Sequence, residues 1–475
     1  MSRVNQRAVT FGTLASRSPP ITKLPAEVLM EIFKAYVKSY PEVLDQRVVD
    51  LCLVGKYWNA VANGTPELWT KINLSFPFAD HHLAAMVKRI HASKLQEIDV
   101  SINFRDPHWD GGEYGDWFEI PKERVWTREV TAVLKGTEKR WKSIKVTSDI
   151  WLPFYELMDE WTFAHLPSLE SISMERVNTI FTLRDVPFDP RQLVGPMTLF
   201  GPNASLPRLR EASLFAVHVD WNDANACFRN LRRLEIMNQA YDVGPSFEQF
   251  AAMLCSSPQL EYLNVTGFCP EPPLPVDGFT VIYVVPLPML KEFIFGWKDV
   301  ELGCTFLQMF QIGPSLESLT LLDTESGLSR WEDPQTGCWG WVQESQRIFE
   351  TLSERGSAVP GDEEDLPPRP FISMRGVKRL RIAWTKAAPS SLAPFLTMLT
   401  GLEEIWLEDV DKNVLDDTAA RIGDTWRRLK KLDLRWTWHE GIPNYAQASV
   451  LQLESVAPML TAQGVEHWRV GQRWP

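Results

Sequence analysis

Few side chains in this 475-residue chain have both the type and the spacing that metal binding or catalysis requires. His81, His82 and His91 form a close group, but no cysteine lies near them and their spacing matches no zinc motif, so a solvated helix explains them better. The acidic run 362–365 lies in the proline-rich segment 357–370, which is typical of a flexible linker rather than a cation site. The sequence therefore predicts no bound metal.

The six cysteines are equally unsuited to a metal site or a disulfide framework. No two of them stand at the C-x-x-C spacing of zinc and redox motifs, and they are scattered over the chain. We therefore expect reduced thiols packed in the core. The cysteines concerned are Cys52, Cys227, Cys255, Cys269, Cys304 and Cys338.

Motifs of catalysis and of other ligand classes are missing from the sequence as well. It contains no G-x-S-x-G, no G-x-G-x-x-G, no phosphate-loop motif and no H-E-x-x-H. Its formal net charge of -12 opposes nucleic-acid binding, which needs a basic surface. The most apolar run, 281–295, is interrupted by Pro286, Pro288 and Lys291 and is too short for a membrane span. We expect no catalytic activity, no cofactor, and neither a nucleic-acid nor a membrane partner.

The first part of the chain instead carries the apolar spacing of short amphipathic helices. Apolar residues recur every three or four positions at Leu29, Ile32, Phe33, Tyr36 and Tyr40, and again at Leu51, Val54, Trp58 and Val61. Gly64 ends the second pattern, and Thr65-Pro66-Glu67 has the capping hydroxyl, proline and acid typical of a new helix. Three short helices enclose little apolar surface, so we expect an apolar face left for a partner.

The order of the anchors in this module resembles the F-box. A leucine-proline opening precedes an isoleucine-phenylalanine pair, a tryptophan late in the second helix and a closing leucine-tryptophan, while Gly55 stands where the family commonly has a cysteine. The resemblance covers residues 21–75 and implies binding to the Skp adaptor of Skp-cullin-F-box ubiquitin ligases; the alternative is a three-helix fragment of a larger core. The implied adaptor-binding residues are Leu24, Pro25, Leu29, Ile32, Phe33, Leu53, Val54, Trp58, Leu68 and Trp69.

Residues 1–20 precede this module and differ from it in composition. They contain three arginines, several Ser and Thr, and no acid. This composition is found in disordered basic arms and also in mitochondrial transit peptides. Because the module that follows resembles part of a cytosolic assembly, we expect a disordered basic arm.

Beyond residue 90, a hexad with apolar residues at its first, fourth and sixth positions recurs. Seven copies have leucine first, a charged residue second and large apolar residues fourth and sixth, where composition alone gives roughly one or two. From Leu231 onward, successive hexads outside the insertions are 25–30 residues apart. The eleven hexads begin at Leu95, Trp141, Leu169, Leu209, Leu231, Leu260, Leu290, Leu316, Val377, Leu402 and Leu429.

This period and the L-x-x-L-x-L core resemble leucine-rich repeats. The resemblance implies that each repeat supplies one parallel strand and a returning helix or loop, and that neighbours stack into a solenoid. We therefore expect an α/β protein with a small all-α three-helix F-box at 21–75, followed by an irregular, horseshoe-shaped solenoid at 76–475. An ordinary α/β domain is the alternative. Insertions are expected near 103–136, 184–207 and 323–374.

Strand alternation predicts which side chains of the repeats face a partner. The fourth and sixth residues of each hexad point into the core, so the third, fifth and seventh point to the opposite, concave face. These side chains form either a cross-strand charge ladder that supports the sheet or a patch that recognises a substrate. In the last three repeats the candidates are Arg379, Arg381, Glu404, Trp406, Glu408, Lys431 and Arg435.

The two resemblances together imply a substrate-recognition subunit of a Skp-cullin-F-box ubiquitin ligase, located in the cytoplasm, the nucleus or both. The subunit itself would not be an enzyme. Its F-box would bind the Skp adaptor, and through it a cullin-RING ligase, while the repeats would hold a protein substrate that the sequence does not name. Two alternatives stay open: a protein-binding scaffold that works outside any ligase, and a receptor in which a small molecule fills the horseshoe.

Overall fold

The computed structural model describes most of the chain between residues 24 and 451. The described residues are 24–39, 44–76, 80–105, 121–162, 165–177, 187–270, 283–328, 345–357, 371–422, 425–435, 447–449 and 451. The expected basic arm and the expected flexible segment after residue 357 lie outside them. Among the described residues, no helix is both long enough and apolar enough to cross a membrane.

The first part of the chain folds into short helices. They are α1 (Ala26–Lys38), α2 (Leu44–Leu53), α3 (Lys56–Asn63) and the 3-10 helix η3 (Pro66–Trp69). The second apolar stripe predicted from the sequence is therefore not one helix, because the chain is extended at Gly55 and the stripe divides between α2 and α3. The hydroxyl of Thr65 does not cap η3 as predicted, but donates to the carbonyl oxygen of Val61 at 2.8 Å.

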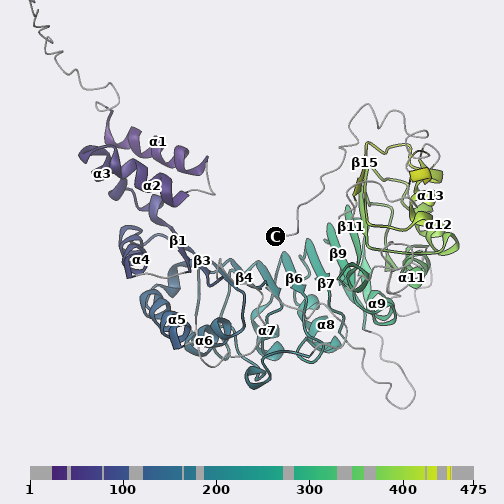
Figure 1. Ribbon diagram of the computed structural model, residues 1–475, viewed down its shortest axis with the longest axis horizontal. Helices are drawn as coiled ribbons and strands as arrows, with labels where there is room; N and C mark the ends of the chain where they lie inside the picture. Colours follow the sequence, from purple (N-terminus) through teal and green to yellow (C-terminus); the bar gives the residue numbers. More distant parts are fainter. Residues whose placement is uncertain are drawn as a thin grey trace, which may run out of the picture.

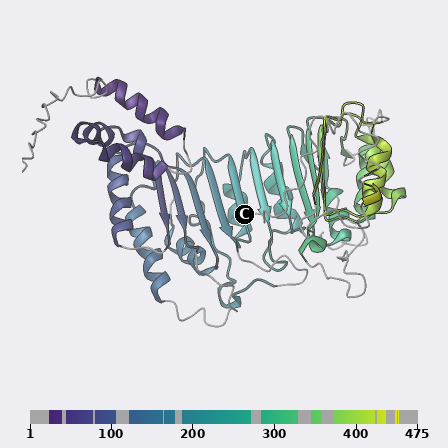
Figure 2. The ribbon, with the colours of Figure 1, turned by 45° about the horizontal axis from the view of Figure 1, so that its top comes forward.

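Twelve parallel strands form the main sheet, and they lie side by side in chain order (Figure 2). Each of the eleven hexads overlaps one strand, from β2 to β15, whereas β1 lies inside the segment that resembles the F-box and was not predicted. The strands are β1 (Lys71–Ser75), β2 (Ile98–Asn103), β3 (Trp141–Ser148), β4 (Ser171–Arg176), β5 (Glu211–Phe215), β6 (Arg233–Met237), β7 (Tyr262–Thr266), β9 (Glu292–Trp297), β11 (Ser318–Asp323), β13 (Arg379–Ala383), β14 (Glu404–Glu408) and β15 (Lys431–Arg435).

Helices connect the strands on the outer side of an arc, and the strands line its inner side (Figure 1). Helices α1 to α3 lie at one end of the arc, next to β1, and α12 and α13 lie at the other. The connecting helices are α4 (Asp80–Ala92), α5 (Pro121–Leu134), α6 (Leu152–Glu160), α7 (Trp221–Cys227), α8 (Phe247–Cys255), α9 (Val300–Leu307), α10 (Thr324–Leu328), α11 (Gln346–Ser357), α12 (Pro389–Met398) and α13 (Lys412–Arg421).

The three predicted insertions have different structures. The first contains α5, and the described part of the second contains only the short 3-10 helix η5 (Arg191–Leu193). The third contains α10 and α11 and ends in β12 (Phe371–Ile372). Strand β12 belongs to a small second parallel sheet with β10 (Phe310–Ile312) and β8 (Val285–Leu287), in the order β12-β10-β8, which the sequence did not reveal.

The buried apolar side chains form two separate cores. One lies among α1, α2, α3 and η3, and it includes Leu29, Phe33 and Trp69. The other runs through the whole sheet and its helices, with the large buried rings of Trp141 and Trp161 in edge contact at 5.4 Å between centroids. The helical module is thus a unit with its own core.

The expectation of core cysteines holds only in part. No described cysteine forms a disulfide. Cys227 and Cys304 are buried, and Cys52 and Cys269 are partly buried. Cys255, the last residue of α8, is exposed. Cys338 lies outside the described residues.

Candidate functional site

Helix α1 separates buried and exposed apolar side chains onto two sides. Leu29, Phe33 and Val37 are four residues apart and face the module's core. Val28 and Ile32 are also four residues apart, but they are exposed. The helix is stabilised locally by an acid in its first turn and a lysine in its last, which complement the helix dipole. The exposed pair is therefore held on a well-formed helix without serving the core.

Helices α2 and α3 expose further large apolar side chains close to α1. Leu53 is 76% exposed and Val54 61% exposed. Arg47 of α2 donates to the Tyr36 hydroxyl of α1 at 2.7 Å, and the Tyr57 hydroxyl of α3 donates to the carbonyl oxygen of Leu24, just before α1, at 2.9 Å. We call the exposed set the apolar face; it consists of Val28, Ile32, Val49, Leu53, Val54 and Tyr57.

The apolar face stands out from the rest of the described surface. It contains six of the eleven large apolar residues that are exposed in the described part of the chain, within thirty consecutive positions, 28–57. Single exposed apolar residues are ordinary, but a concentration of them marks an interaction site. The helical module thus exposes six large apolar side chains that its own core does not cover.

The ten predicted adaptor-binding residues divide into those that present surface and those that support it. Exposed are Pro25, Ile32, Leu53 and Val54; partly buried are Leu24 and Trp58; buried are Leu29, Phe33, Leu68 and Trp69. The buried four lie in the core beneath the face. Val28, Val49 and Tyr57 were missing from the prediction, although the spacing of four from Val28 to Ile32 and from Val49 to Leu53 was a usable signal.

The core beneath the face is built around aromatic rings. The Phe33 and Trp58 rings lie 5.0 Å apart at a tilt of 49°. The indole N–H of Trp69 donates to the carbonyl oxygen of Ala62 at 2.9 Å. These contacts join α1, α3 and η3, and so fix the relative positions of the helices that carry the exposed residues.

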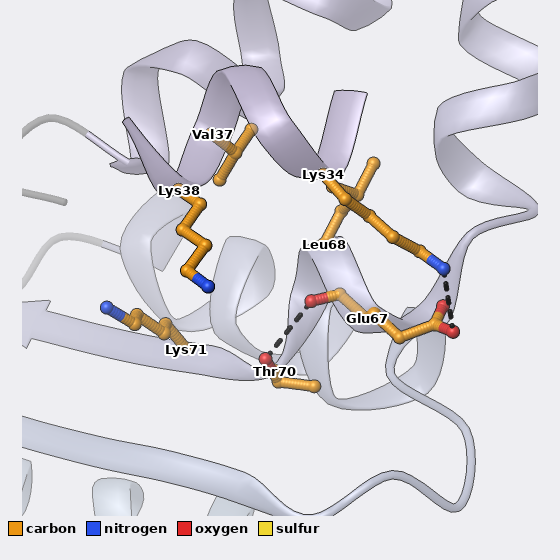
Figure 3. Close-up of a pocket in the computed structure, with 7 residues that line it drawn as sticks. All are labelled: Lys34, Val37, Lys38, Glu67, Leu68, Thr70 and Lys71. Atoms are coloured by element: carbon orange, nitrogen blue, oxygen red, sulfur yellow. Dashed lines mark hydrogen bonds and ion pairs between the residues drawn. The ribbon is translucent and has the colours of Figure 1, made fainter. Parts of the chain in front are cut away.

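A cavity of about 290 Å³ lies between α1, η3 and β1 (Figure 3). Lys34 forms ion pairs with Glu31 at 3.1 Å and with Glu67 at 3.3 Å, and these hydrogen bonds raise the pKa of Lys34. The hydroxyl of Thr70 donates to the backbone carbonyl of Glu67 at 3.2 Å. The seven lining residues, shown in Figure 3, are Lys34, Val37, Lys38, Glu67, Leu68, Thr70 and Lys71. They offer three lysine ammonium groups, a carboxylate paired with Lys34 and a hydroxyl that already donates a hydrogen bond, so we regard the cavity as part of the junction between module and sheet.

No metal centre is found in the described part of the chain, where no three His, Cys, Asp or Glu residues are grouped as metal ligands. His81, His82 and His91 lie on α4 and are exposed, as expected of a solvated helix. The rings of His81 and His82 are 4.1 Å apart.

Aligning the last three hexads residue by residue predicts the register of their strands, and β13, β14 and β15 have that register. Glu404 of β14 lies between Arg379 and Lys431. In the next row Trp406 lies between Arg381 and Asp433, and in the third Glu408 pairs with Arg435. All seven predicted substrate-binding residues therefore lie together on one side of β13, β14 and β15.

Two of the arginines in this group form ion pairs with carboxylates on the same strand or the next one. Arg381 donates to the carboxylate of Glu408 at 2.5 Å, and that side chain is only 5% exposed. Arg435 donates to Asp433 at 2.7 Å. Trp406, which strand alternation predicts to be exposed on the concave face, is partly buried, with the Lys431 ammonium 5.2 Å from its ring centroid. This pairing favours a supporting charge ladder for Arg381 and Glu408.

Comparison with known proteins gives one result for the helical module. The F-box-like family model matches residues 21–75. A comparison with curated proteins found no match. The F-box-like domain supports an F-box protein, and domains of this kind typically bind the Skp adaptor and so connect to cullin-RING ligases. The apolar face lies within the matched residues.

Proposed function

We propose that this protein is a substrate-recognition subunit of a Skp-cullin-F-box ubiquitin ligase. The observation that carries the proposal is the apolar face, which concentrates exposed apolar residues on the module that matches the F-box-like family. The Skp adaptor would cover this face. Ile32, Leu53 and Val54 would make direct contacts, while Leu29 and Phe33 would hold the helices in place from the core.

We further propose that the sheet and its helices are an irregular leucine-rich-repeat solenoid. Support comes from the eleven hexads, each on one strand, and from the sequential parallel order of the twelve strands. In such a stack the strand residues that point away from the core share one continuous surface. That surface would bind the protein substrate.

The proposed role needs no catalytic group in this chain. A partner RING subunit would recruit the ubiquitin-loaded enzyme, and this protein would contribute proximity by holding the substrate near it. A subunit of this kind acts in the cytoplasm, the nucleus or both.

The test is affinity purification of the tagged, full-length chain from cells with the proteasome blocked. The comparison variant carries Ile32→Asp and Leu53→Asp, which place charges on the apolar face; deleting residues 21–75 would be less clean, because it would also remove β1. Leu95→Asp is the matched control, since Leu95 is 91% exposed and lies outside the F-box-like segment. We expect Skp and cullin subunits with the intact chain and the control, and neither with the double variant.

The outcome also separates the alternatives. Skp without a cullin would point to a scaffold that acts outside the ligase. A small molecule of reproducible mass in the purified protein, required for partner binding, would point to a receptor. Equal recovery of Skp by the double variant and the intact chain would refute the role proposed for the apolar face.

A further inference from the structure

The residues at the second hexad position form a row along one edge of the main sheet. From β4 onward each immediately precedes its strand, and the backbone N–H of each donates to the carbonyl oxygen of its counterpart in the preceding repeat at 2.7–2.9 Å. The side chains are therefore held at the spacing of neighbouring strands. This row, the entry rim, consists of Lys142, Glu170, Arg210, Arg232, Glu261, Lys291, Glu317, Lys378, Glu403 and Lys430.

Charges of opposite sign alternate along most of the entry rim and form ion pairs. The printed sequence shows the alternation, and the pairs are Lys142–Glu170 at 3.9 Å, Lys291–Glu261 at 2.5 Å, Lys378–Glu317 at 3.0 Å and Lys430–Glu403 at 2.5 Å. Hydrogen bonds from the lysines lower the pKa of Glu261 and of Glu403. Most of the rim thus has its charges compensated within the sheet.

The alternation fails at one place, between β5 and β6, where Arg210 and Arg232 are neighbours. On one side, Glu170 is occupied by Lys142 and by Arg208. On the other, Glu261 is occupied by Lys291. Neither arginine therefore forms an ion pair with a carboxylate of the rim, although Arg232 adds to the lowering of the pKa of Glu261 that the Lys291 hydrogen bond causes first.

The two arginines differ in what their side chains do. The guanidinium of Arg210 folds back to donate to the carbonyl oxygen of Leu209 at 2.7 Å. Arg232 is exposed and makes no side-chain hydrogen bond or ion pair with any described residue. Arg229, two residues before the hexad, is likewise exposed and unpaired among the described residues. A cationic spot remains on a protein whose net charge is -12.

We propose that Arg210 and Arg232 form a docking site for an acidic segment of a partner protein, one that presents neighbouring carboxylates. A guanidinium binds a carboxylate through two parallel hydrogen bonds, and two arginines at strand spacing fit consecutive acidic side chains of an extended segment. Such a segment would supply the negative charge that the rim supplies for itself everywhere else. The site lies at the strand edge, away from the apolar face, and does not depend on the function proposed above.

The test measures binding of a fluorescein-labelled oligoglutamate peptide to the full-length protein by fluorescence anisotropy. Arg232→Gln and Arg210→Gln should each weaken binding about fivefold, and raising the salt concentration should weaken it further. Arg128→Gln is the matched control, because Arg128 is an exposed arginine on α5 with no ion pair among the described residues. The control should bind the peptide as the unmodified protein does, and an uncharged oligoglutamine peptide should not bind.

Thermal unfolding separates docking from a structural role. Arg232→Gln removes one of two like-charged neighbours, so its melting temperature should be unchanged or slightly higher. Absence of peptide binding, equal binding by the Arg232 and Arg128 variants, or a weaker affinity accompanied by a lower melting temperature in Arg232→Gln would each overturn the proposal.

Discussion

Truncating Leu53 to alanine should weaken adaptor binding without affecting the fold. The side chain is 76% exposed, so the change removes three carbons that contribute little to the core. If the adaptor covers them, each lost carbon forfeits about 0.8 kcal/mol of burial, and scaling by the exposed fraction gives about 2 kcal/mol. The expected loss of affinity for purified Skp adaptor is therefore about thirtyfold.

Isothermal titration calorimetry with purified adaptor gives this affinity, and thermal unfolding gives the stability. Leu95→Ala is the matched control, because Leu95 is 91% exposed and lies beyond the F-box-like segment; it should change neither quantity. Leu29→Ala should behave in the opposite way to Leu53→Ala, with the helical module destabilised by about 2–5 kcal/mol, since Leu29 is completely buried. An unchanged affinity in Leu53→Ala, or a stability loss as large as that of Leu29→Ala, would refute the division between face and core.

Three further outcomes test the repeats. Burial raises the pKa of Asp411 from 3.8 to about 6, so the folded state binds the proton more tightly and stability falls as the pH rises from about 4 to 6. Urea unfolding at pH 4 and pH 7 gives the fall in the free energy of unfolding between the two pH values. In Asp411→Asn this fall should be roughly 3 kcal/mol smaller than in the unmodified protein, and an equal fall in both proteins would disprove the prediction. Gly376→Ala should lower the free energy of unfolding by about 1–3 kcal/mol, because the added Cβ would lie 2.2 Å from a backbone carbonyl oxygen. Gly55→Ala is the control and should leave the free energy of unfolding unchanged, because the space around Gly55 is open. Equal losses of stability in the two variants would contradict this prediction. Arg381→Gln should lower stability by about 3 kcal/mol by leaving the buried Glu408 carboxylate without its cation, and an unchanged melting temperature would show that the pair does not support the fold.

The repeats were predictable because their signal is both local and repeated. A hexad with apolar residues at positions one, four and six combines strand alternation with a leading apolar anchor, and each copy reports the same geometry independently. Alignment of the copies gave the correct register across β13, β14 and β15, including the row of Arg381, Trp406 and Asp433. Register is well specified in such a sheet, because a slip of one residue would turn the buried leucines outward.

The features that the sequence did not reveal depend on single side chains or on contacts between distant segments. Gly55 divides a helical stripe whose apolar spacing continues across the break. In the leucine-rich repeats that the hexads resemble, an asparagine commonly stands three places past each hexad, and in this sequence only Asn103 does so. In two later repeats other residues satisfy neighbouring backbone there: the Thr324 hydroxyl donates to the carbonyl oxygen of Trp297 at 2.7 Å, and Lys298 donates to that of Gln239 at 3.2 Å. Like asparagine, these side chains donate hydrogen bonds to the backbone, but they are other residue types, so a motif search misses them.

For the candidate site, too, the sequence did not reveal what depends on contacts between helices. The motif identified the helical module, but it did not distinguish residues that present surface from residues that support it. Leu53 and Leu29 are both leucines on amphipathic helices, yet one is exposed and the other buried. The difference arises from how α1 packs against α2 and α3, which is a tertiary property.

A short connection joins the helical module to the sheet, and one side chain contacts both. Trp69 belongs to the module's core, and Lys71, two residues later, begins β1. Arg89 of α4 is buried, lies with its guanidinium 5.6 Å from the Trp69 ring centroid and donates to the carbonyl oxygen of Lys71 at 3.4 Å. Because the ring and the strand belong to different cores, this contact restrains one relative to the other. The proposed function needs such a restraint, since a substrate on the sheet gains effective concentration at the ligase only if the sheet is held in a limited range of orientations relative to the adaptor.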